Sequence, residues 1–185
     1  MEQAIEKIKG KSGFIIDMDG VIYHGNKLLP GVTEFLAWLE NSGKKYLFLT
    51  NASERTPKEL HEKLLRLGIN VGEEHFYTSA LATAGFLASQ KPSGSAFIIG
   101  DAGLIHALYS IGYTSNNINP DYVVVGETHS YNFEKIATAV NLVLKGAKLI
   151  GTNPDESSPV ENGIAPSTKA LIAPIEIATG RKAYY

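Results

Sequence analysis

The fold of this chain is decided by the stretch Gly13-Phe14-Ile15-Ile16-Asp17-Met18-Asp19-Gly20-Val21. A short apolar run that ends at a turn signal is typical of a strand buried on both faces, and Gly20 permits a sharp turn after it. In open α/β sheets, ligands bind at the carboxyl ends of strands, which is where Asp17 and Asp19 stand. Two acids held there repel each other unless a cation lies between them, and a hard divalent cation suits oxygen ligands. The stretch therefore predicts an α/β fold with a site for magnesium and a phosphate ester.

The composition is that of a globular domain without a basic surface. The chain has 185 residues, of which 44% are hydrophobic, and 17 Lys and Arg stand against 19 Asp and Glu. This balance argues against a nucleic-acid partner. The absence of cysteine excludes disulfides and thiolate metal sites. Residues 1–9 are charged and lack the apolar core of a signal peptide, and no apolar run reaches the ~18 residues of a membrane helix. We expect a cytoplasmic protein with no membrane partner.

The next elements predict a βαβ unit. Apolar residues at helical spacing predict a helix over 31–41, and residues 44–49 read as a second buried strand. The crossover should be right-handed and the strands parallel, which brings Thr50 and Asn51 near the two acids. Residues 21–30, which contain Gly25 and Asn26, predict a small hairpin or flap.

The remaining sequence predicts a second α/β unit. Thr56, a proline at 57 and Glu59 form a good helix start, and that helix should end at Gly68. Another helix is expected over 80–90, and the breaker-rich stretch 91–95 is a candidate linker. Beyond it we expect strands over 96–99, 122–125 and 148–151, and helices over 103–111, 133–145 and 168–179.

The acid pair suggests phosphoryl transfer. A carboxylate is ionised at neutral pH and can attack phosphorus without a base, so Asp17 is the candidate nucleophile. Asp19 could protonate the leaving alcohol and later deprotonate a water. Mg²⁺ bound by Asp17 and by the phosphate oxygens would lower the charge repulsion, and Thr50 and Asn51 would donate hydrogen bonds to the phosphoryl oxygens.

Two other interpretations of the acid pair are weaker. A calcium-binding EF-hand loop needs more oxygen ligands and a preceding helix, whereas a strand precedes this pair. A purely structural turn would place two acids beside an apolar strand without using them. Gly100-Asp101 could be mistaken for a metal loop, but the sequence offers no nearby second acid, and a strand-to-helix turn is expected. The five histidines show no zinc-binding spacing.

These residues resemble a known family. Residues 17–21 resemble the first motif of haloacid dehalogenase superfamily phosphatases, and Leu49-Thr50-Asn51 resembles the second. Longer segments are similar to the NagD-type (class IIA) nucleotide monophosphatases of that superfamily, and they lie at 76–80, 103–108, 119–128 and 152–155.

The resemblance implies a Rossmann-like core, with an inserted C2-type α/β cap. Residues 1–92 and 182–185 would form the core and residues 93–181 the cap. It also implies Mg²⁺-dependent hydrolysis of phosphate monoesters, nucleoside monophosphates such as UMP among them, with a possible homo-oligomer. In such enzymes Asp17 would be the nucleophile and a metal ligand, and Asp19 the acid/base whose backbone carbonyl also contacts the metal. Thr152, Asn153 and Asp155 would lie on the cap loop that faces the substrate, although an Asn-Pro-Asp turn explains the same residues.

The sequence departs from the family pattern at its end. Residues 180–185 resemble the strand before the third-motif lysine, but that lysine and the acids of the fourth motif do not follow. We therefore expect a core that lacks its C-terminal strands and a chain with little turnover of its own. The alternatives are a phosphatase of sugar, glycolate or vitamin phosphates and, from another class, a non-catalytic binding or dimerisation module.

Overall fold

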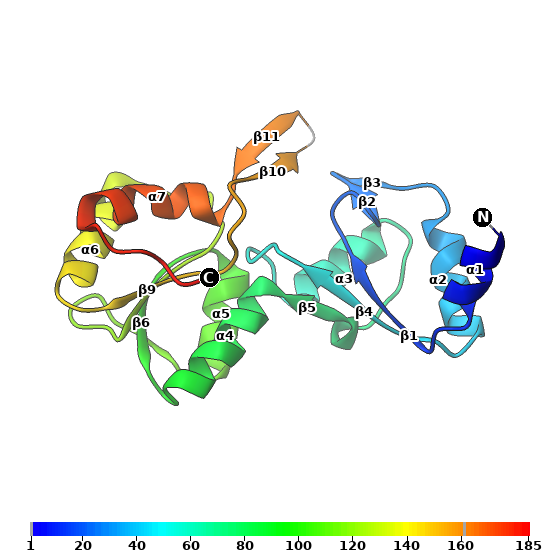
Figure 1. Cartoon of the computed structure of the whole chain (residues 1–185), viewed down its shortest axis with the longest axis horizontal. Coiled ribbons are helices and arrows are strands. Elements are labelled where there is room, and N and C mark those ends of the chain that lie inside the picture. Colours follow the sequence, from blue (N-terminus) through cyan, green and yellow to red (C-terminus); the bar gives the residue numbers. More distant parts are fainter. Residues whose placement is uncertain (1, 161) are drawn as a thin grey trace. The chain divides into compact units, whose positions relative to one another are not determined.

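The computed structural model describes residues 2–160 and 162–185, which form two compact units (Figure 1). The first unit contains Met1–Thr50 and Leu60–Tyr77, and the second contains Asn51–Glu59 and Thr78–Tyr185. None of the helices within the described residues is long and apolar enough to cross a membrane.

The first unit is built on a three-stranded sheet in the order β1-β4-β5. Strands β1 (Gly13–Asp17) and β4 (Lys45–Thr50) are parallel and are joined through helix α2 (Val32–Asn41), which confirms the predicted βαβ unit. The predicted flap is also present as the hairpin of β2 (Tyr23–His24) and β3 (Lys27–Leu28). Three further elements are not among those expected from the sequence, namely helix α1 (Glu2–Lys9), the 3-10 turn η1 (Glu73–His75) and strand β5 (Phe76–Thr78).

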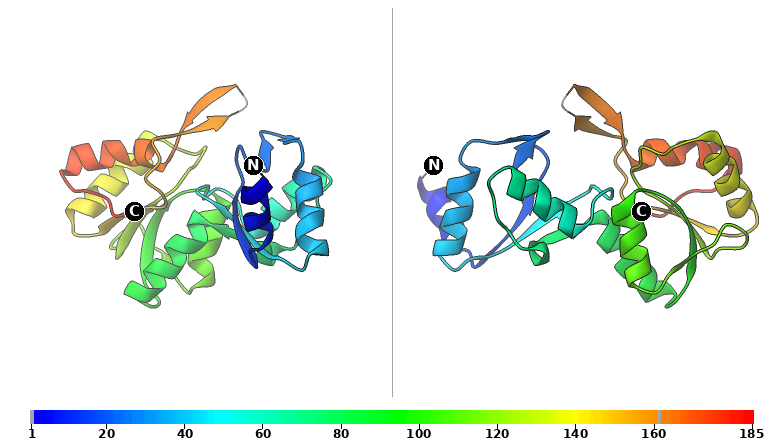
Figure 2. Two further views of the ribbon diagram at one scale, coloured as in Figure 1. Left: turned by 45° about the vertical axis from the view of Figure 1, so that its right-hand side comes forward. Right: turned by 180° about the vertical axis from the view of Figure 1, so that it is seen from behind.

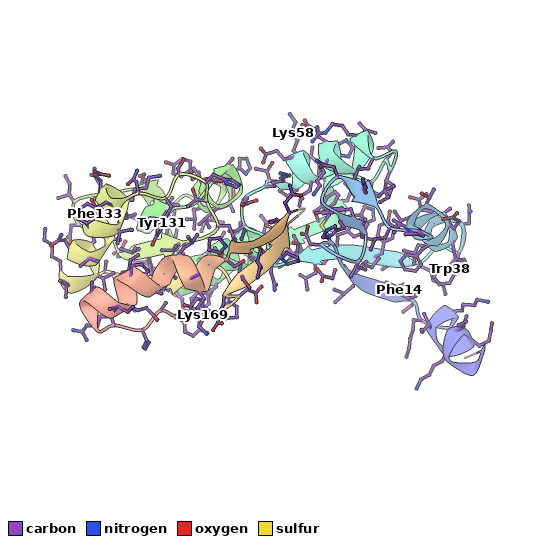
Figure 3. The ribbon with its side chains drawn as sticks, turned by 90° about the horizontal axis from the view of Figure 1, so that it is seen from above. Phe14, Trp38, Lys58, Tyr131, Phe133 and Lys169 are labelled. Atoms are coloured by element: carbon purple, nitrogen blue, oxygen red, sulfur yellow. The ribbon has the colours of Figure 1, made fainter. Side chains whose placement is uncertain are left out.

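The core of the first unit gathers buried residues of its sheet, of α2 and of residues 60–71. Met18, Leu39 and Phe48 are fully buried in it. Burial of such a side chain stabilises the fold by about 1.5–3 kcal/mol. At one edge Phe14 and Trp38 pack edge to face with their ring centroids 5.6 Å apart (Figure 3).

Helix α3 (Pro57–Arg66) begins with the capping box that the sequence predicts. The backbone N–H of Thr56 donates to Glu59 Oε2 at 2.8 Å, and the backbone N–H of Glu59 donates to Thr56 Oγ1 at 3.2 Å. Each side chain thus satisfies a backbone group that the helix itself leaves unpaired.

The second unit is built on a four-stranded parallel sheet in the order β7-β6-β8-β9. In the part of the chain that the structure describes, four helices cover it. The predicted elements all form, within two residues of the expected bounds, and β7 was not predicted. The strands are β6 (Ser95–Ile99), β7 (Thr114–Ser115), β8 (Tyr122–Val125) and β9 (Lys148–Gly151), and the helices are α4 (Ser79–Gln90), α5 (Ala102–Ser110), α6 (Phe133–Leu144) and α7 (Thr168–Thr179).

Helices cover both faces of this sheet, and strand β8 shows the consequence. All four of its residues are buried. Val124 packs in the cluster under α4 and α5, whereas Val123 and Val125 pack in the cluster under α6 and α7. The two helix pairs lie on opposite sides of the sheet in Figure 1. A strand buried on both faces needs an uninterrupted apolar run, as β8 has.

The boundary between the units differs from the domain boundaries expected from the sequence. It falls before α4 and not within residues 91–95, because α4 packs on α5 in the second unit. Residues 182–185 also belong to the second unit, since Tyr184 pairs with Ile150 at the edge of β9. The backbone N–H of Gly151 donates to the carbonyl of Tyr184 at 2.9 Å.

A hairpin was missed by the sequence analysis. Strands β10 (Ser157–Val160) and β11 (Gly163–Pro166) pair in antiparallel fashion before α7. They contain two prolines and few apolar residues. Their sequence therefore lacks both the β-branched and aromatic composition of a strand and the alternation of apolar and polar residues that marks a half-buried one. Figure 2 shows this hairpin extending away from the sheet of the second unit.

Candidate active site

Asp17 and Asp19 lie at the carboxyl end of β1, as the sequence predicts. Both residues are exposed, and Met18 between them is fully buried, so alternation along the backbone directs the two acids to the same side. The backbone N–H of Met18 donates to Asp17 Oδ1 at 2.8 Å. The chain then turns sharply at Gly20, whose φ of +77° few other residues adopt.

Thr50 ends the neighbouring strand at the same edge of the sheet. The parallel register pairs Asp17 with Leu49, so Thr50 stands one position beyond the acid on β4. Thr50 itself is buried. The structure therefore brings Asp17, Asp19 and Thr50 together within the first unit.

The residues at this strand end fit a magnesium ion. Mg²⁺ prefers oxygen ligands, binds through one or two carboxylates and keeps several of its waters. Asp17 and Asp19 offer two exposed carboxylates two residues apart, next to the backbone carbonyl groups of a turn. The donor set contains no soft ligand, in agreement with a chain that has no cysteine.

Asn51 follows Thr50 directly and lies in a polar network of the second unit. Its Nδ2 donates to Asp155 Oδ2 at 2.8 Å. Its backbone carbonyl accepts hydrogen bonds from Asn153 Nδ2 at 2.8 Å and from Ser79 Oγ at 2.6 Å. Both the side chain and the backbone of Asn51 are thus held by residues distant in sequence.

The three residues expected on the cap loop differ in what they contact. Asn153 is 4% exposed, and besides Asn51 its side chain contacts Glu127 and the backbone N–H of Asp155. Thr152 Oγ1 lies 2.9 Å from Thr168 Oγ1. Asp155 is half-buried and meets the Asn51 side chain. Because Thr152 and Asn153 bond to other residues of the second unit, the geometry favours a structural role for these two side chains. Asp155 lies beside the Asn51 side chain.

Glu127 is not among the site residues predicted from the sequence, yet it is 9% exposed and lies at the centre of this network. Its Oε2 accepts hydrogen bonds from the backbone N–H and the hydroxyl of Ser53, and its Oε1 accepts one from Asn153 Nδ2 at 2.6 Å. The signal was available, because Glu127 follows the buried strand β8 after a single glycine, much as Asp17 ends β1.

A second group of side chains was also missed. Asp101 precedes α5, which confirms the predicted strand-to-helix turn, but the fold supplies the neighbours that the sequence lacks. Glu54, Asp101 and His129 offer ligand atoms that all lie within 4.8 Å of one another. Burial raises the pKa of Glu54, the charges of Glu127 and Asp101 add to the rise, and His129 and Arg55 oppose it.

Comparison with known proteins identifies the family. The profile of the haloacid dehalogenase-like hydrolases matches residues 14–114, which include both acids and Thr50. The chain belongs to this family. Within it, the chain is of the NagD type: it is 42% identical to the ribonucleotide monophosphatase NagD of Escherichia coli over 92% of its length, and the match covers 67% of that protein.

Solved structures agree with this assignment. The structure of NagD from E. coli K-12 superimposes on 94% of the chain, with a TM-score of 0.86 and 41% identity, and 68% of NagD is covered. A glycerol phosphate phosphatase from Mycobacterium tuberculosis, solved in complex with magnesium, superimposes on 93% of the chain with a TM-score of 0.86 and 27% identity, and 53% of it is covered.

A dihydroxyacetone phosphatase from Corynebacterium glutamicum is similarly related. It is 42% identical over 93% of the chain, and the match covers 62% of its own length. The chain thus spans about two thirds or less of the length of these relatives.

Proposed function

We propose that the protein containing this chain hydrolyses small phosphate monoesters through an aspartyl-phosphate on Asp17. The observation that carries the proposal is the arrangement of Asp17 and Asp19 at the carboxyl end of β1, with Thr50 ending the adjacent parallel strand. Membership of the haloacid dehalogenase-like hydrolases supports it.

The chemistry proceeds in two displacements. An oxygen of Asp17 attacks the phosphorus, the bond from phosphorus to the ester oxygen breaks, and Asp19 donates a proton to the departing alcohol. Asp19 then accepts a proton from a water that attacks the aspartyl-phosphate, which releases inorganic phosphate and regenerates the Asp17 carboxylate. A single acid thus serves both steps, because the first leaves Asp19 as a base.

The neutral donors at the end of β4 assist this chemistry. We assign the Thr50 hydroxyl and the Asn51 amide to the phosphoryl oxygens, whose charge shifts in the transition state. The Asp17 carboxylate and the backbone carbonyl of Asp19 would hold Mg²⁺, which would supply the positive charge that lets an anionic nucleophile approach a phosphate.

We propose nucleoside monophosphates such as UMP as substrates, with small sugar or triose phosphates as the second candidate. The relatives named for ribonucleotide and dihydroxyacetone phosphate chemistry support the two possibilities to a similar degree. Both classes carry hydroxyl groups near the phosphate, and the Asp155 carboxylate beside Asn51 is suited to accept a hydrogen bond from one. We assign the first unit to the catalytic core and most of the second to the cap.

Phosphate release from a panel of esters tests this proposal. The panel contains UMP and other nucleoside monophosphates, dihydroxyacetone phosphate and sugar phosphates, with Mg²⁺ or with EDTA. Asp17→Asn should abolish release by the complete protein, and EDTA should do the same. Glu34→Gln, an exposed acid on α2, serves as the matched control and should leave the rates unchanged. Release that survives Asp17→Asn would overturn the proposal.

A further inference from the structure

The segment 51–55, which links β4 to α3, belongs to the second unit and packs there against two glycines. A Cβ atom on Gly103 would lie 2.5 Å from the carbonyl oxygen of Arg55, and one on Gly126 would lie 2.5 Å from Ser53 Oγ. The backbone N–H of Gly103 also donates to the carbonyl of Glu54 at 2.8 Å. Side chains at the two glycine positions would therefore keep the segment away.

Glu127 holds the segment 51–55 through hydrogen bonds to Ser53. The carboxylate accepts the backbone N–H of Ser53 at 3.2 Å as well as its hydroxyl, and Ser53 Oγ in turn accepts the backbone N–H of Glu127 at 3.0 Å. Ser53 is fully buried, so these bonds do not compete with bulk water. Hydrogen bonds to an ionised acceptor are about twice as strong as neutral ones.

The carboxylate also reaches Asn51 through one intermediate residue. Glu127 Oε1 accepts one N–H of Asn153 Nδ2 at 2.6 Å, and the same nitrogen donates to the backbone carbonyl of Asn51 at 2.8 Å. An amide nitrogen has two hydrogens, so Asn153 can make both bonds at once. Glu127 thereby fixes which way the Asn153 amide faces.

We propose that Glu127 is a positioning residue that acts through Ser53 and Asn153 to set the place of Asn51. The inference rests on the proposed function, in which the Asn51 amide binds the phosphoryl group. A donor displaced by about 1 Å loses much of its effect on a transition state, which can cost about 100-fold in rate.

The first experiment measures kcat and KM of the complete protein for its best phosphate ester. Glu127→Gln should lower kcat about 10- to 100-fold and change KM by less than about threefold, because the lost alignment matters most in the transition state. Glu134→Gln, an exposed acid on α6, is the matched control and should not change either constant. An unchanged kcat in the folded Glu127→Gln protein would overturn the proposal.

A double variant separates positioning from stability. In Glu127→Gln/Asn153→Asp, the new amide can donate to the new carboxylate, so the bond between positions 127 and 153 is restored with reversed polarity. The carboxylate at 153 cannot donate to the Asn51 carbonyl, so the double variant lacks that bond. We expect the melting temperature to rise above that of Glu127→Gln while kcat stays low. Recovery of kcat together with the melting temperature would contradict a positioning role.

Hydrogen exchange provides a measurement that does not need turnover. The backbone N–H of Ser53 should exchange faster in Glu127→Gln, while strands β6 and β8 keep their protection. Wild-type protein without phosphatase activity would refute the proposed function and with it the catalytic part of this inference. Equal exchange at Ser53 in both proteins would refute the part in which Glu127 holds the segment.

Discussion

Gly103 lies against the backbone of Arg55, so that a Cβ atom at position 103 would be 2.5 Å from the Arg55 carbonyl oxygen. Gly103 is the second residue of α5, where alanine would otherwise favour the helix. The close approach of the segment 51–55 therefore explains why a glycine stands in this helix. The same contact helps to hold Asn51, which belongs to that segment.

Gly103→Ala should destabilise the protein by about 1–3 kcal/mol, because a backbone carbonyl must move to admit the methyl group. Gly85→Ala is the matched control: Gly85 lies inside α4 with open space around it and should gain up to about 1 kcal/mol. Urea denaturation measures both changes. A Gly103→Ala protein as stable as the Gly85→Ala protein would contradict this prediction, because the segment 51–55 could then move aside without a cost in stability.

Asp121 should contribute stability that depends on pH. A hydrogen bond from Lys91 and another from the backbone N–H of Ser95 lower its pKa below the ordinary value of 3.8. A lowered pKa means that the stabilisation is present above the unfolded-state pKa and is lost as the pH falls through the folded-state pKa. Asp121→Asn should cost up to about 1 kcal/mol near pH 7, and the difference should shrink at acid pH. Denaturation curves at several pH values test this, and a constant difference would contradict it.

The contribution of Glu54 to stability should depend on pH in the opposite direction. Its pKa is raised chiefly by burial, so the folded state favours the protonated form. The contribution is fully present below the unfolded-state pKa and is lost as the pH rises through the folded-state pKa. Glu54→Gln should therefore raise the melting temperature at neutral pH and change it little at about pH 4.

Glu34→Gln, which alters an exposed acid, should leave the melting temperature unchanged at both pH values. A Glu54→Gln protein that melts lower than the wild type at neutral pH would mean that the attraction to His129 and Arg55 outweighs the burial of Glu54.

The sequence was sufficient for most of the fold, because its elements carry strong local signals. The run that ends at Asp17 predicts a strand, and the Thr56–Glu59 capping box predicts the start of α3. The expectation that this strand is buried on both faces was wrong, because Ile16 is buried while Ile15 is 74% exposed. Such signals act within a few residues of the chain. Elements without them, such as β7 and the β10–β11 hairpin, were missed.

The sequence could predict the positions of candidate site residues only where short motifs at strand ends contain them. Asp17, Asp19 and Thr50 follow from two strand ends and one parallel register. The contact of Ser53 with Glu127 joins residues 74 positions apart, and the contact of Asn51 with Asp155 joins residues 104 apart. No local pattern specifies such pairs, so the contacts that Asn153 and Glu127 make became visible only in the folded chain, although the position of Glu127 just after β8 was readable from the sequence.

The boundary between the two compact units differs from the expected linker for a related reason. Residues 91–95 contain the breakers of a linker, but Lys91 bonds to Asp121 and the Tyr113 hydroxyl donates to the Lys91 carbonyl at 2.8 Å. A stretch rich in proline and glycine predicts a turn, whereas the packing of α4 on α5 decides to which unit the helix belongs.

The most direct test of the central claim is a rapid acid quench of the complete protein during turnover of a ³²P-labelled phosphate monoester with Mg²⁺. If the reaction passes through an aspartyl-phosphate, the label is bound covalently to the wild-type protein, where peptide mapping locates it at Asp17, and Asp17→Asn carries no label. Phosphate release at a normal rate without any protein-bound label would contradict it, because water would then attack the ester directly.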